Sequence, residues 1–223
     1  MKYYAIIVGG GSGSRMGTAI PKQFLLLNGK PVLMHTIQAF YMSGLKPEII
    51  VVLNIDYHQY WEKLCTDHQF DIPHTLVKAG RQRFYSVKNG LNQVKGQAVV
   101  AIHDAVRPLV SDNLITSSFQ EAEMKGSAVC AIPASDSIRR VVGKWSERLN
   151  RDEIFLVQTP QTFESAILKK AYTQPYRVAF TDDASVVEKS GKQINLIPGE
   201  KTNIKITYRE DILIAELLLG QKK

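Results

Sequence analysis

The residues with the clearest chemistry lie within the first 22 positions of the chain. A glycine-rich loop, Gly9-Gly10-Gly11-Ser12-Gly13-Ser14, follows a short apolar run, and Arg15 and Lys22 come soon after it. Glycines leave backbone N–H groups open to an anion because no Cβ stands in the way. Arg offers a planar fork and Lys a compact charge to phosphate oxygens. The stretch therefore predicts a polyphosphate site.

Two widespread phosphate motifs do not fit this loop. A P-loop needs Gly-Lys-Ser/Thr at its end, whereas Gly17 is followed by Thr18. The dinucleotide-binding fingerprint needs a third glycine where Met16 stands and a helix directly after it, but Pro21 prolongs the loop. A plain surface turn rarely needs the five glycines found between positions 9 and 17, so we favour phosphate binding over a plain turn.

A second group of polar residues follows the apolar run 97–103. Asp104 is suited to Mg²⁺ or to a ligand hydroxyl, because a triphosphate normally arrives with a metal bridging its oxygens. Arg107 is suited to a phosphate group. An Asp–Arg pair that merely caps a loop is the alternative, and these residues alone leave it open.

Three further segments carry candidate ligand contacts. Gly80, Arg83 and Ser86 lie at the expected start of a helix, where unpaired N–H groups favour anions, although a solvated basic turn is an equal alternative. Thr181 precedes two aspartates that suit an ordinary helix N-cap. Lys205 lies between two isoleucines, and this pattern predicts that it ends a strand of the sheet.

Strands and helices alternate along most of the chain. The pattern predicts strands at 3–8, 48–54, 75–78, 97–103, 127–132 and 193–197. It predicts helices at 31–44, from Asp56 as N-cap toward Phe70, at 81–95, from the N-cap Ser111 to 125, at 181–191 and from about 209. This order is typical of a Rossmann-like α/β fold, a mostly parallel sheet with helices on both faces. Ligands bind beyond the carboxyl ends of such strands, so the glycine loop, 80–86 and 103–108 should meet at one edge.

The alternation breaks between Ala134 and Phe163. The runs 138–142 and 154–157 indicate two strands, with a turn at 143–146 between them and no helix. We expect a protruding antiparallel β-arm at about 134–158, within a single nucleotidyltransferase domain that spans 1–223. An isolated hairpin cannot bury its own apolar side chains, so the arm is expected to form a homodimer interface. The apolar residues concerned are Ile138, Val141, Val142, Trp145, Ile154 and Phe155.

Composition places limits on the partners. With 44% hydrophobic and 22% charged residues, the chain has the composition of a globular protein, and no apolar run reaches membrane-spanning length. A net charge of +7 indicates an anionic partner, but the basic residues are scattered, which argues against nucleic acid. Cys65 and Cys130 follow no metal-ligand spacing. We therefore expect a cytoplasmic protein that binds phosphorylated metabolites.

Taken together, the motifs resemble the family of 2-C-methyl-D-erythritol 4-phosphate cytidylyltransferases. The resemblance covers nearly the whole chain in GGGSGSRMG…PKQF, AGRQRFYSV, HDAVRP, NRDEI, QTPQTF, TDDAS and NIKIT. It implies a cytidylyl transfer from CTP to methylerythritol phosphate, with Mg²⁺ or another divalent cation, in the non-mevalonate isoprenoid pathway. It also implies a β-arm that interlocks two subunits.

The resemblance assigns roles by position. Arg15 and Lys22 would be catalytic and would stabilise the transition state. The nucleotide would contact Gly9, Gly10, Gly11, Gly80, Ser86 and Ala105. Methylerythritol phosphate would contact Asp104, Arg107, Ser137, Arg151, Thr181 and Lys205, some of them from the other subunit. Arg81 and Ser137 depart from the family pattern, which often has Asp and Thr there.

Two alternative functions remain at this point. Ribitol-5-phosphate cytidylyltransferases share the glycine loop and HDAVRP, although Thr181-Asp182-Asp183-Ala184 and Gln158-Thr159-Pro160-Gln161 are closer to the methylerythritol family. A non-catalytic nucleotide-binding regulator of the same fold is the alternative from another class. The presence of both Arg15 and Lys22 argues against it, because binding alone does not require both.

Overall fold

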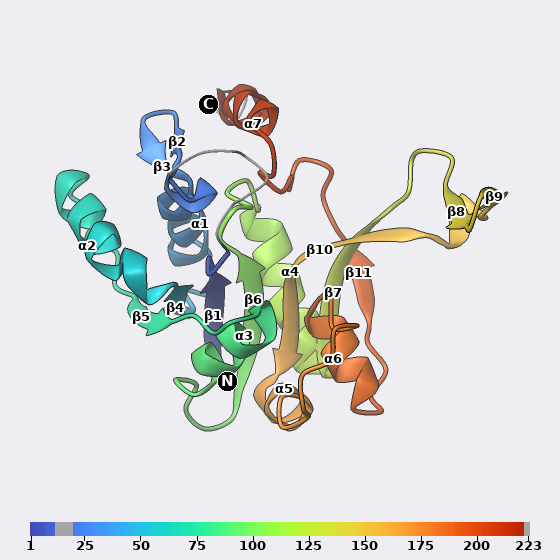
Figure 1. Cartoon of the computed structure of the whole chain (residues 1–223). Coiled ribbons are helices and arrows are strands. Elements are labelled where there is room, and N and C mark those ends of the chain that lie inside the picture. The colour runs from blue at the N-terminus through green and yellow to red at the C-terminus, as the bar shows by residue number, and fades with distance from the viewer. Residues whose placement is uncertain (12–19, 221–223) are drawn as a thin grey trace.

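A seven-stranded sheet with the strand order β11-β7-β10-β6-β1-β4-β5 runs through the middle of the molecule (Figure 1). The structure is a computed structural model that describes residues 1–11 and 20–220. Neighbouring strands are parallel except β10, which is antiparallel to both β6 and β7. The strands are β1 (Lys2–Val8), β4 (Glu48–Leu53), β5 (Thr75–Lys78), β6 (Ala98–Asp104), β7 (Ser127–Pro133), β10 (Phe155–Glu164) and β11 (Leu196–Pro198). The predicted mostly parallel α/β fold is confirmed.

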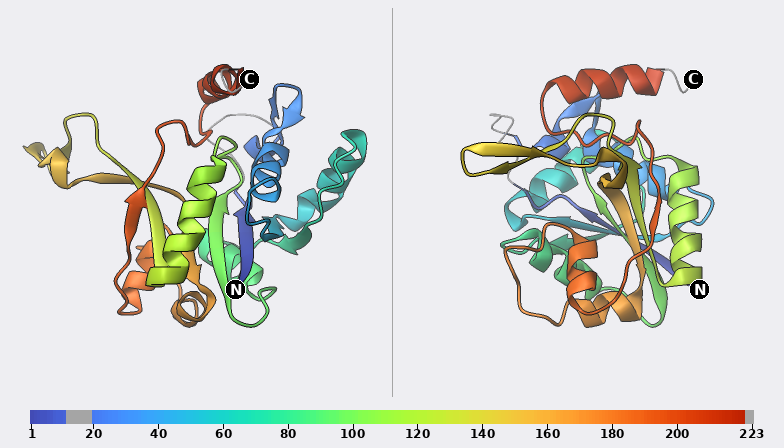
Figure 2. Two further views of the ribbon diagram at one scale, coloured as in Figure 1. Left: turned by 180° about the vertical axis from the view of Figure 1, so that it is seen from behind. Right: turned by 90° about the vertical axis from the view of Figure 1, so that its right-hand side faces the viewer.

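Helices cover both faces of this sheet (Figure 2). Alternate residues of β1 point to opposite faces, so Ala5 and Ile7 join one core cluster while Tyr4 and Ile6 join the other. The first cluster includes side chains of α1 (Val32–Tyr41), α2 (His58–Asp67) and α4 (Asp112–Lys125). The second includes side chains of α3 (Arg83–Leu91), α5 (Ser165–Ala171) and α6 (Asp183–Lys189).

A smaller apolar cluster lies at the end of the sheet where the C-terminal helix α7 (Glu210–Gly220) packs. It includes Leu27 of β2 (Leu26–Leu27), which pairs with β3 (Lys30–Pro31), and residues of the loop that follows β6. The backbone N–H of Ile206 donates to the carbonyl of Val106 at 2.9 Å, which holds the segment before α7 to that loop. Lys205 thus lies in an irregular segment, and its prediction as part of a strand is wrong.

Capping residues explain where several helices begin. The Ser111 side chain accepts a hydrogen bond from the Leu114 N–H at 3.0 Å and starts α4 as predicted, and Gly126 ends that helix at φ +83°. The expected cap at Asp56 is wrong. Asn54 instead accepts from the Asp56 N–H and starts the 3₁₀ helix η3 (Ile55–Tyr57), which leads into α2.

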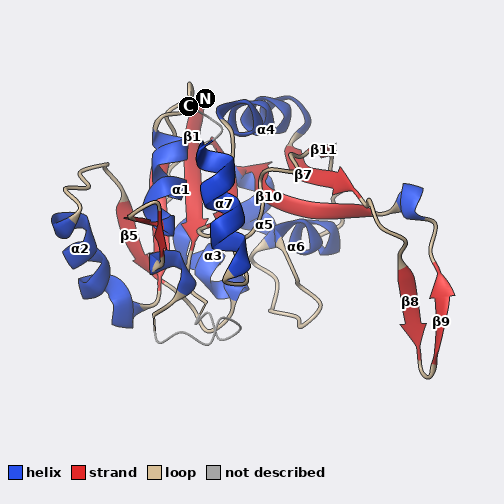
Figure 3. Cartoon of the chain, turned by 90° about the horizontal axis from the view of Figure 1, so that it is seen from above, coloured by secondary structure: helices blue, strands red, loops and turns tan. Residues whose placement is uncertain are grey.

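The arm exists, but its strands pair differently from the prediction. β8 (Arg139–Val142) pairs with β9 (Trp145–Arg148), and together they project from the sheet (Figure 3). The run 154–157 is not the returning strand of the hairpin, because Phe155 to Val157 pair with β7 as the start of β10. The predicted turn at 143–146 is therefore too long, since Trp145 and Ser146 already belong to β9.

Candidate active site

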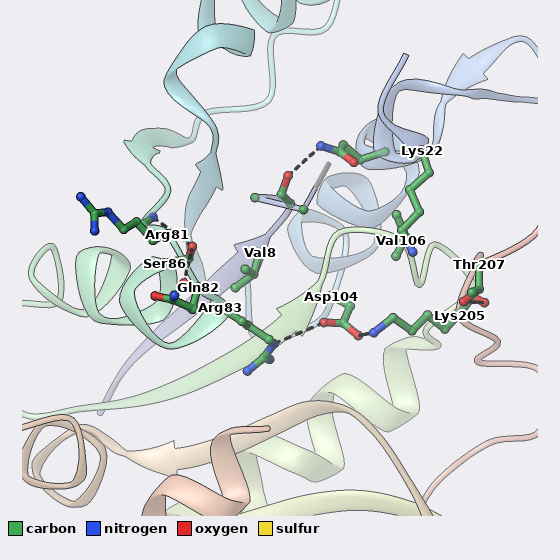
Figure 4. Close-up of a pocket in the computed structure, with 15 residues that line it drawn as sticks. Val8, Lys22, Arg81, Gln82, Arg83, Ser86, Asp104, Val106, Lys205 and Thr207 are labelled. Atoms are coloured by element: carbon green, nitrogen blue, oxygen red, sulfur yellow. Dashed lines mark hydrogen bonds and ion pairs between the residues drawn. The ribbon is translucent and has the colours of Figure 1, made fainter. Parts of the chain in front are cut away.

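A cavity of about 340 Å³ lies at the carboxyl ends of β1 and β6, beside the start of α3 (Figure 4). The three loops that the sequence predicts at one sheet edge meet here, which confirms that prediction. The cavity is lined by Val8, Gly9, Gly10, Gly11, Lys22, Gln23, Gly80, Arg81, Gln82, Arg83, Ser86, Asp104, Val106, Lys205 and Thr207.

Close packing explains two of the glycines after β1. A Cβ on Gly9 would lie 2.8 Å from Cδ2 of Leu53, and one on Gly10 would lie 2.8 Å from Cβ of Ala79. A side chain at either position would clash with these neighbours, so the close approach of this backbone to the ends of the neighbouring strands favours glycine. Gly11 differs, because among the described residues no atom would lie within 4 Å of a Cβ there. As far as the described residues go, the space beside Gly11 is open to a ligand.

The segment from Gly80 to Ser86 forms the opposite wall of the cavity. A Cβ on Gly80 would come within 2.9 Å of the backbone carbonyl carbon of Tyr85, so the turn requires glycine. The Gly80 N–H donates to Oγ of Ser86 at 3.1 Å, and the Ser86 hydroxyl donates to the Gln82 carbonyl. α3 begins without a side-chain cap, so its first N–H groups and its dipole suit an anionic ligand.

Among the described residues that line the cavity, Asp104 is the only one with a carboxylate. Three cationic side chains surround it. Lys205 Nζ lies 2.8 Å from Oδ2, and the Nε atoms of Arg83 and Arg107 each lie 3.7 Å from a carboxylate oxygen. Arg83 and Lys205 approach from opposite sides (Figure 4). Burial alone would raise the pKa of Asp104, but these cations outweigh it and hold the pKa well below its usual value. Asp104 is therefore ionised at neutral pH.

A network of hydrogen bonds fixes the position of this carboxylate and of Lys205. The Asp104 N–H donates to Oγ1 of Thr159 on β10 at 3.0 Å. Arg107 Nη1 donates to the Asn203 carbonyl at 2.7 Å, and Asn203 Nδ2 donates to the Thr159 carbonyl at 2.8 Å. The loop after β6, β10 and the segment 203–207 therefore hold one another in place.

Lys22 belongs to the same arrangement. It begins the 3₁₀ helix η2 (Lys22–Phe24), and its Nζ donates to the Ile206 carbonyl at 3.1 Å. The ammonium group thus reaches the cavity from the glycine-loop side and meets the segment that carries Lys205. Arg15, the other predicted catalytic residue, lies outside the described residues.

The structure brings together eight of the predicted site residues in the cavity lining: Gly9, Gly10, Gly11, Lys22, Gly80, Ser86, Asp104 and Lys205. Ala105 is buried, with its N–H bonded to the Val8 carbonyl at 3.0 Å, and Arg107 is buried beside Asp104. Thr181 is exposed just before α6. Ser137 and Arg151 are exposed on the arm and do not line this cavity.

Sequence reasoning missed Thr159 and Asn203 as supporting residues, and it missed the partner of Arg83. Arg83 lines the cavity, and its expected contact with a nucleotide stays a prediction. Its Nη2 donates to Oδ2 of the buried Asp183 at 2.6 Å. The two residues are 100 positions apart, so no local pattern could have paired them. Thr159 and Asn203 lie in QTPQTF and NIKIT, whose resemblance to a family was the one signal present.

The residues present do not favour a metal site built by the protein. The described part of the chain contains no group of three His, Cys, Asp or Glu side chains placed to hold a metal ion. Asp104 was the candidate ligand, but its oxygens face Lys205, Arg83 and Arg107. A divalent cation bound there would lie among three positive charges, which disfavours Asp104 as a ligand.

The fold and the cavity define a nucleotide-binding α/β protein, with a glycine backbone on one side of its pocket and an ionised Asp104 among cations on the other. Comparison with known proteins makes this specific. The chain belongs to the 2-C-methyl-D-erythritol 4-phosphate cytidylyltransferase family, whose model matches residues 3–221. The resemblance noted in the sequence is thereby confirmed.

Individual relatives support the same family. A 2-C-methyl-D-erythritol 4-phosphate cytidylyltransferase of Azobacteroides pseudotrichonymphae is 50% identical over 218 residues, covering 97% of this chain and 98% of the relative. That of Phocaeicola vulgatus is 46% identical, covering 98% and 100%. The crystal structure of the Thermus thermophilus enzyme superposes with a TM-score of 0.80 at 27% identity, covering 99% of this chain and 100% of that one.

Proposed function

We propose that the protein transfers a cytidylyl group from CTP to 2-C-methyl-D-erythritol 4-phosphate, releasing pyrophosphate and forming 4-diphosphocytidyl-2-C-methyl-D-erythritol. The observation that carries this proposal is the cavity itself, in a chain that matches the family over residues 3–221. Its glycine backbone suits the nucleotide, and Lys22 and Lys205 bring positive charge to the same space.

The reaction needs positioning and charge more than a nucleophilic side chain. A phosphate oxygen of the acceptor attacks the α-phosphorus of CTP, a new P–O bond forms, and the bond to the leaving pyrophosphate breaks. The attacking phosphate is already ionised, so no general base is required. Such transfers are served by orientation and by neutralising the charge that grows on the leaving oxygens. Lys22, with Arg15, would supply that neutralisation.

We propose that the two substrates occupy different parts of the cavity. The nucleotide half would be formed by Gly9, Gly10, Gly11, Gly80 and Ser86, with the buried Ala105 behind them. The acceptor half would be formed by Asp104 and Lys205, supported by the buried Arg107 and with the exposed Thr181 outside the cavity lining, and Asp104 can accept a hydrogen bond from an acceptor hydroxyl. The Lys205 ammonium lines the same cavity, paired with Asp104, and its charge suits the acceptor phosphate.

We further propose that a second copy completes the acceptor half. Ser137 and Arg151 do not line the cavity of their own chain, and both lie on the exposed arm. An arm that reaches a two-fold partner would bring them to the partner's pocket and would cover its own apolar residues. The active form would then be a homodimer with two shared sites.

A divalent cation is part of the proposal as a companion of the triphosphate. Because Asp104 is surrounded by cations, we assign no protein ligand to it and derive no step from it. The test is a magnesium titration of Asp104→Asn. The half-saturating Mg²⁺ concentration should stay within about twofold of wild type, while the KM for the acceptor rises. A large shift of the Mg²⁺ dependence would assign Asp104 to the metal.

The direct test of function follows pyrophosphate release with CTP, Mg²⁺ and either methylerythritol phosphate or ribitol 5-phosphate. We expect turnover with methylerythritol phosphate and CTP, and little with ATP or GTP. Preference for ribitol 5-phosphate would select the alternative acceptor. Tight CTP binding without any turnover would select the non-catalytic regulator. Nothing in the described site favours either alternative.

The expected location in the cytoplasm stays a proposal. Among the residues that the structure describes, no helix has both the length and the apolar character needed to cross a bilayer. Binding of nucleic acid is not part of the proposed function.

A further inference from the structure

We propose that Arg83 is a positioning residue that orients Asp104 in the acceptor half of the cavity, and that a buried pair, Asp183 and Tyr172, anchors it. This inference rests on the proposed function, because it concerns the same site. It gives a role to two side chains, Asp183 and Tyr172, that do not line the cavity.

The anchor is a carboxylate without access to any ligand. Asp183 is fully buried at the first turn of α6, and its Oδ1 accepts a hydrogen bond from the Tyr172 hydroxyl at 2.5 Å. Its N–H donates to Oε1 of Gln161 on β10 at 3.0 Å. Burial and the neighbouring carboxylate raise the pKa of Tyr172, so its hydroxyl stays a donor. A buried carboxylate is costly unless it is well paired, and here its strongest partner is Arg83.

Arg83 connects this anchor to the cavity. Its Nη2 lies 2.6 Å from Oδ2 of Asp183, while its Nε lies 3.7 Å from Oδ1 of Asp104. Burial alone would lower the pKa of Arg83, but Asp183 and Asp104 outweigh it and raise the pKa. The guanidinium is therefore always charged. Its Nη2 is held more tightly by Asp183 than its Nε is by Asp104.

The difference between these two distances gives the anchor its function. At 3.7 Å, the pair with Asp104 is electrostatic and is too long for a hydrogen bond. Oδ1 of Asp104 thus keeps its capacity to accept a hydrogen bond from an acceptor hydroxyl. Without Asp183, Arg83 would be free to close on Asp104 as a two-pronged pair and to occupy that oxygen.

The same arrangement balances charge. Arg83, Arg107 and Lys205 bring three positive charges to Asp104, and Asp183 supplies a second negative charge that offsets Arg83. Lys205 then remains the main partner of Asp104 at 2.8 Å. Loss of Asp183 should therefore disturb the acceptor half of the site and leave the glycine-backbone half intact.

The experiment compares Asp183→Asn, Tyr172→Phe and the control Ser185→Ala with wild type. Ser185 belongs to the capping box of the same helix but does not contact Arg83, so its variant controls for a loosened α6. Tyr172→Phe keeps the ring that stacks on Phe84 with centroids 4.7 Å apart, and it serves as the test if Asp183→Asn fails to fold. The measurements are kcat/KM for methylerythritol phosphate and the Kd for CTP by calorimetry.

We expect Asp183→Asn to lower kcat/KM for the acceptor at least tenfold and Tyr172→Phe to lower it about threefold, with CTP affinity within twofold of wild type. Ser185→Ala should match wild type in both measurements. In an Asp104→Asn background, the Asp183→Asn effect should shrink to less than twofold, which a merely structural role would not produce.

If wild type is active, two results would overturn the inference. One is that Asp183→Asn and Tyr172→Phe fold and keep the wild-type kcat/KM for the acceptor. The other is that their affinity for CTP falls as much as their kcat/KM for the acceptor. Wild type that releases no pyrophosphate would refute the proposed function and this inference with it.

Discussion

The pocket and the arm of this protein are opposites in construction. Around the pocket, Asp104 is 8% exposed and is held by hydrogen bonds and ion pairs from four separate parts of the chain. On the arm, Trp145 is 82% exposed and Val141 is 76% exposed, and β8 pairs with β9 alone. The pocket residues are tied together within the described part of the chain, whereas the apolar side chains of the arm remain exposed.

This difference is what the proposed shared site would require. The described residues of the pocket are held by contacts within the chain, and such contacts lower the cost of ordering a site on binding. The arm is a two-stranded ribbon, which is marginal by itself in water. Its exposed apolar residues and the exposed Arg151 agree with the proposed contact with a second subunit.

The largest effect is expected in the pocket, at Lys22. Lys22→Ala should lower kcat on the order of 10²–10³-fold, because under the proposed mechanism it removes a positive charge that neutralises the leaving pyrophosphate. CTP affinity should fall much less. Steady-state kinetics and calorimetry separate the two, with the surface variant Lys63→Ala as control. Near-normal kcat with a raised KM would make Lys22 a simple binding residue.

The next effect belongs to the arm. Trp145→Ala should weaken a dimer about 30-fold or more, since a buried interface Trp typically contributes at least ~2 kcal/mol. Sedimentation over a concentration series measures the dissociation constant, and activity should fall as the protein dissociates. Lys144→Ala, at the turn beside it, is the matched control. A wild-type protein that is fully active as a monomer would refute the proposal that the arm contributes to the active site of a second subunit.

A third variant tests the open space beside the glycine loop. Gly11→Ala adds a methyl group that meets no atom of the described residues within 4 Å, so the stability of the fold should not change. If CTP lies against this backbone, its KM should rise on the order of 10-fold, as expected for about 1–2 kcal/mol of overpacking. Gly44→Ala, which is equally free of contacts, is the control. Unchanged CTP kinetics would place the nucleotide elsewhere.

The last effect concerns stability and leaves activity at neutral pH unchanged. Burial, partly offset by the hydrogen bond to the Arg107 carbonyl, lowers the pKa of His103 to about 4. The unfolded chain, with an ordinary His pKa near 6.5, therefore binds a proton between pH 6.5 and 4 that the folded chain does not. Stability should fall across this window as the pH is lowered, by on the order of 2–3 kcal/mol from this group.

His103→Gln tests this assignment, because its side-chain amide can still donate to the Arg107 carbonyl. Urea unfolding of both proteins at pH 7, 5.5 and 4.5 should show a shallower decline for the variant. Parallel curves would assign the pH dependence to other groups.

The sequence predicted strands and helix ends well where one local signal determines the structure. The run 75–78 matches β5, and Ser111 caps α4, because alternation and a capping hydroxyl act over a few residues. It missed the polar part of β10, since Gln158, Thr159 and Pro160 contradict a buried strand. A register shift between Val157 and Gln161 accommodates them.

The site was predictable to the extent that loops at one sheet edge must meet. Gly9, Gly80 and Asp104 fall together for that reason. The pairing of Arg83 with Asp183 joins two residues 100 positions apart and could not be predicted from spacing. The run 154–157 was misassigned because its apolar residues fit either an arm or a sheet strand, and only its partner β7 decides.

The claim that pocket and arm from different subunits form one site has a direct test in subunit mixing. Lys22→Ala impairs the pocket and leaves the arm intact, while Arg151→Ala impairs the arm and leaves the pocket intact. A heterodimer of the two should contain one wild-type site, so mixing two nearly inactive proteins should recover up to about half of the wild-type activity per heterodimer. If the mixture stays as inactive as its parents after mass spectrometry has shown subunit exchange, Arg151 does not act across an interface and the account of a shared site is wrong.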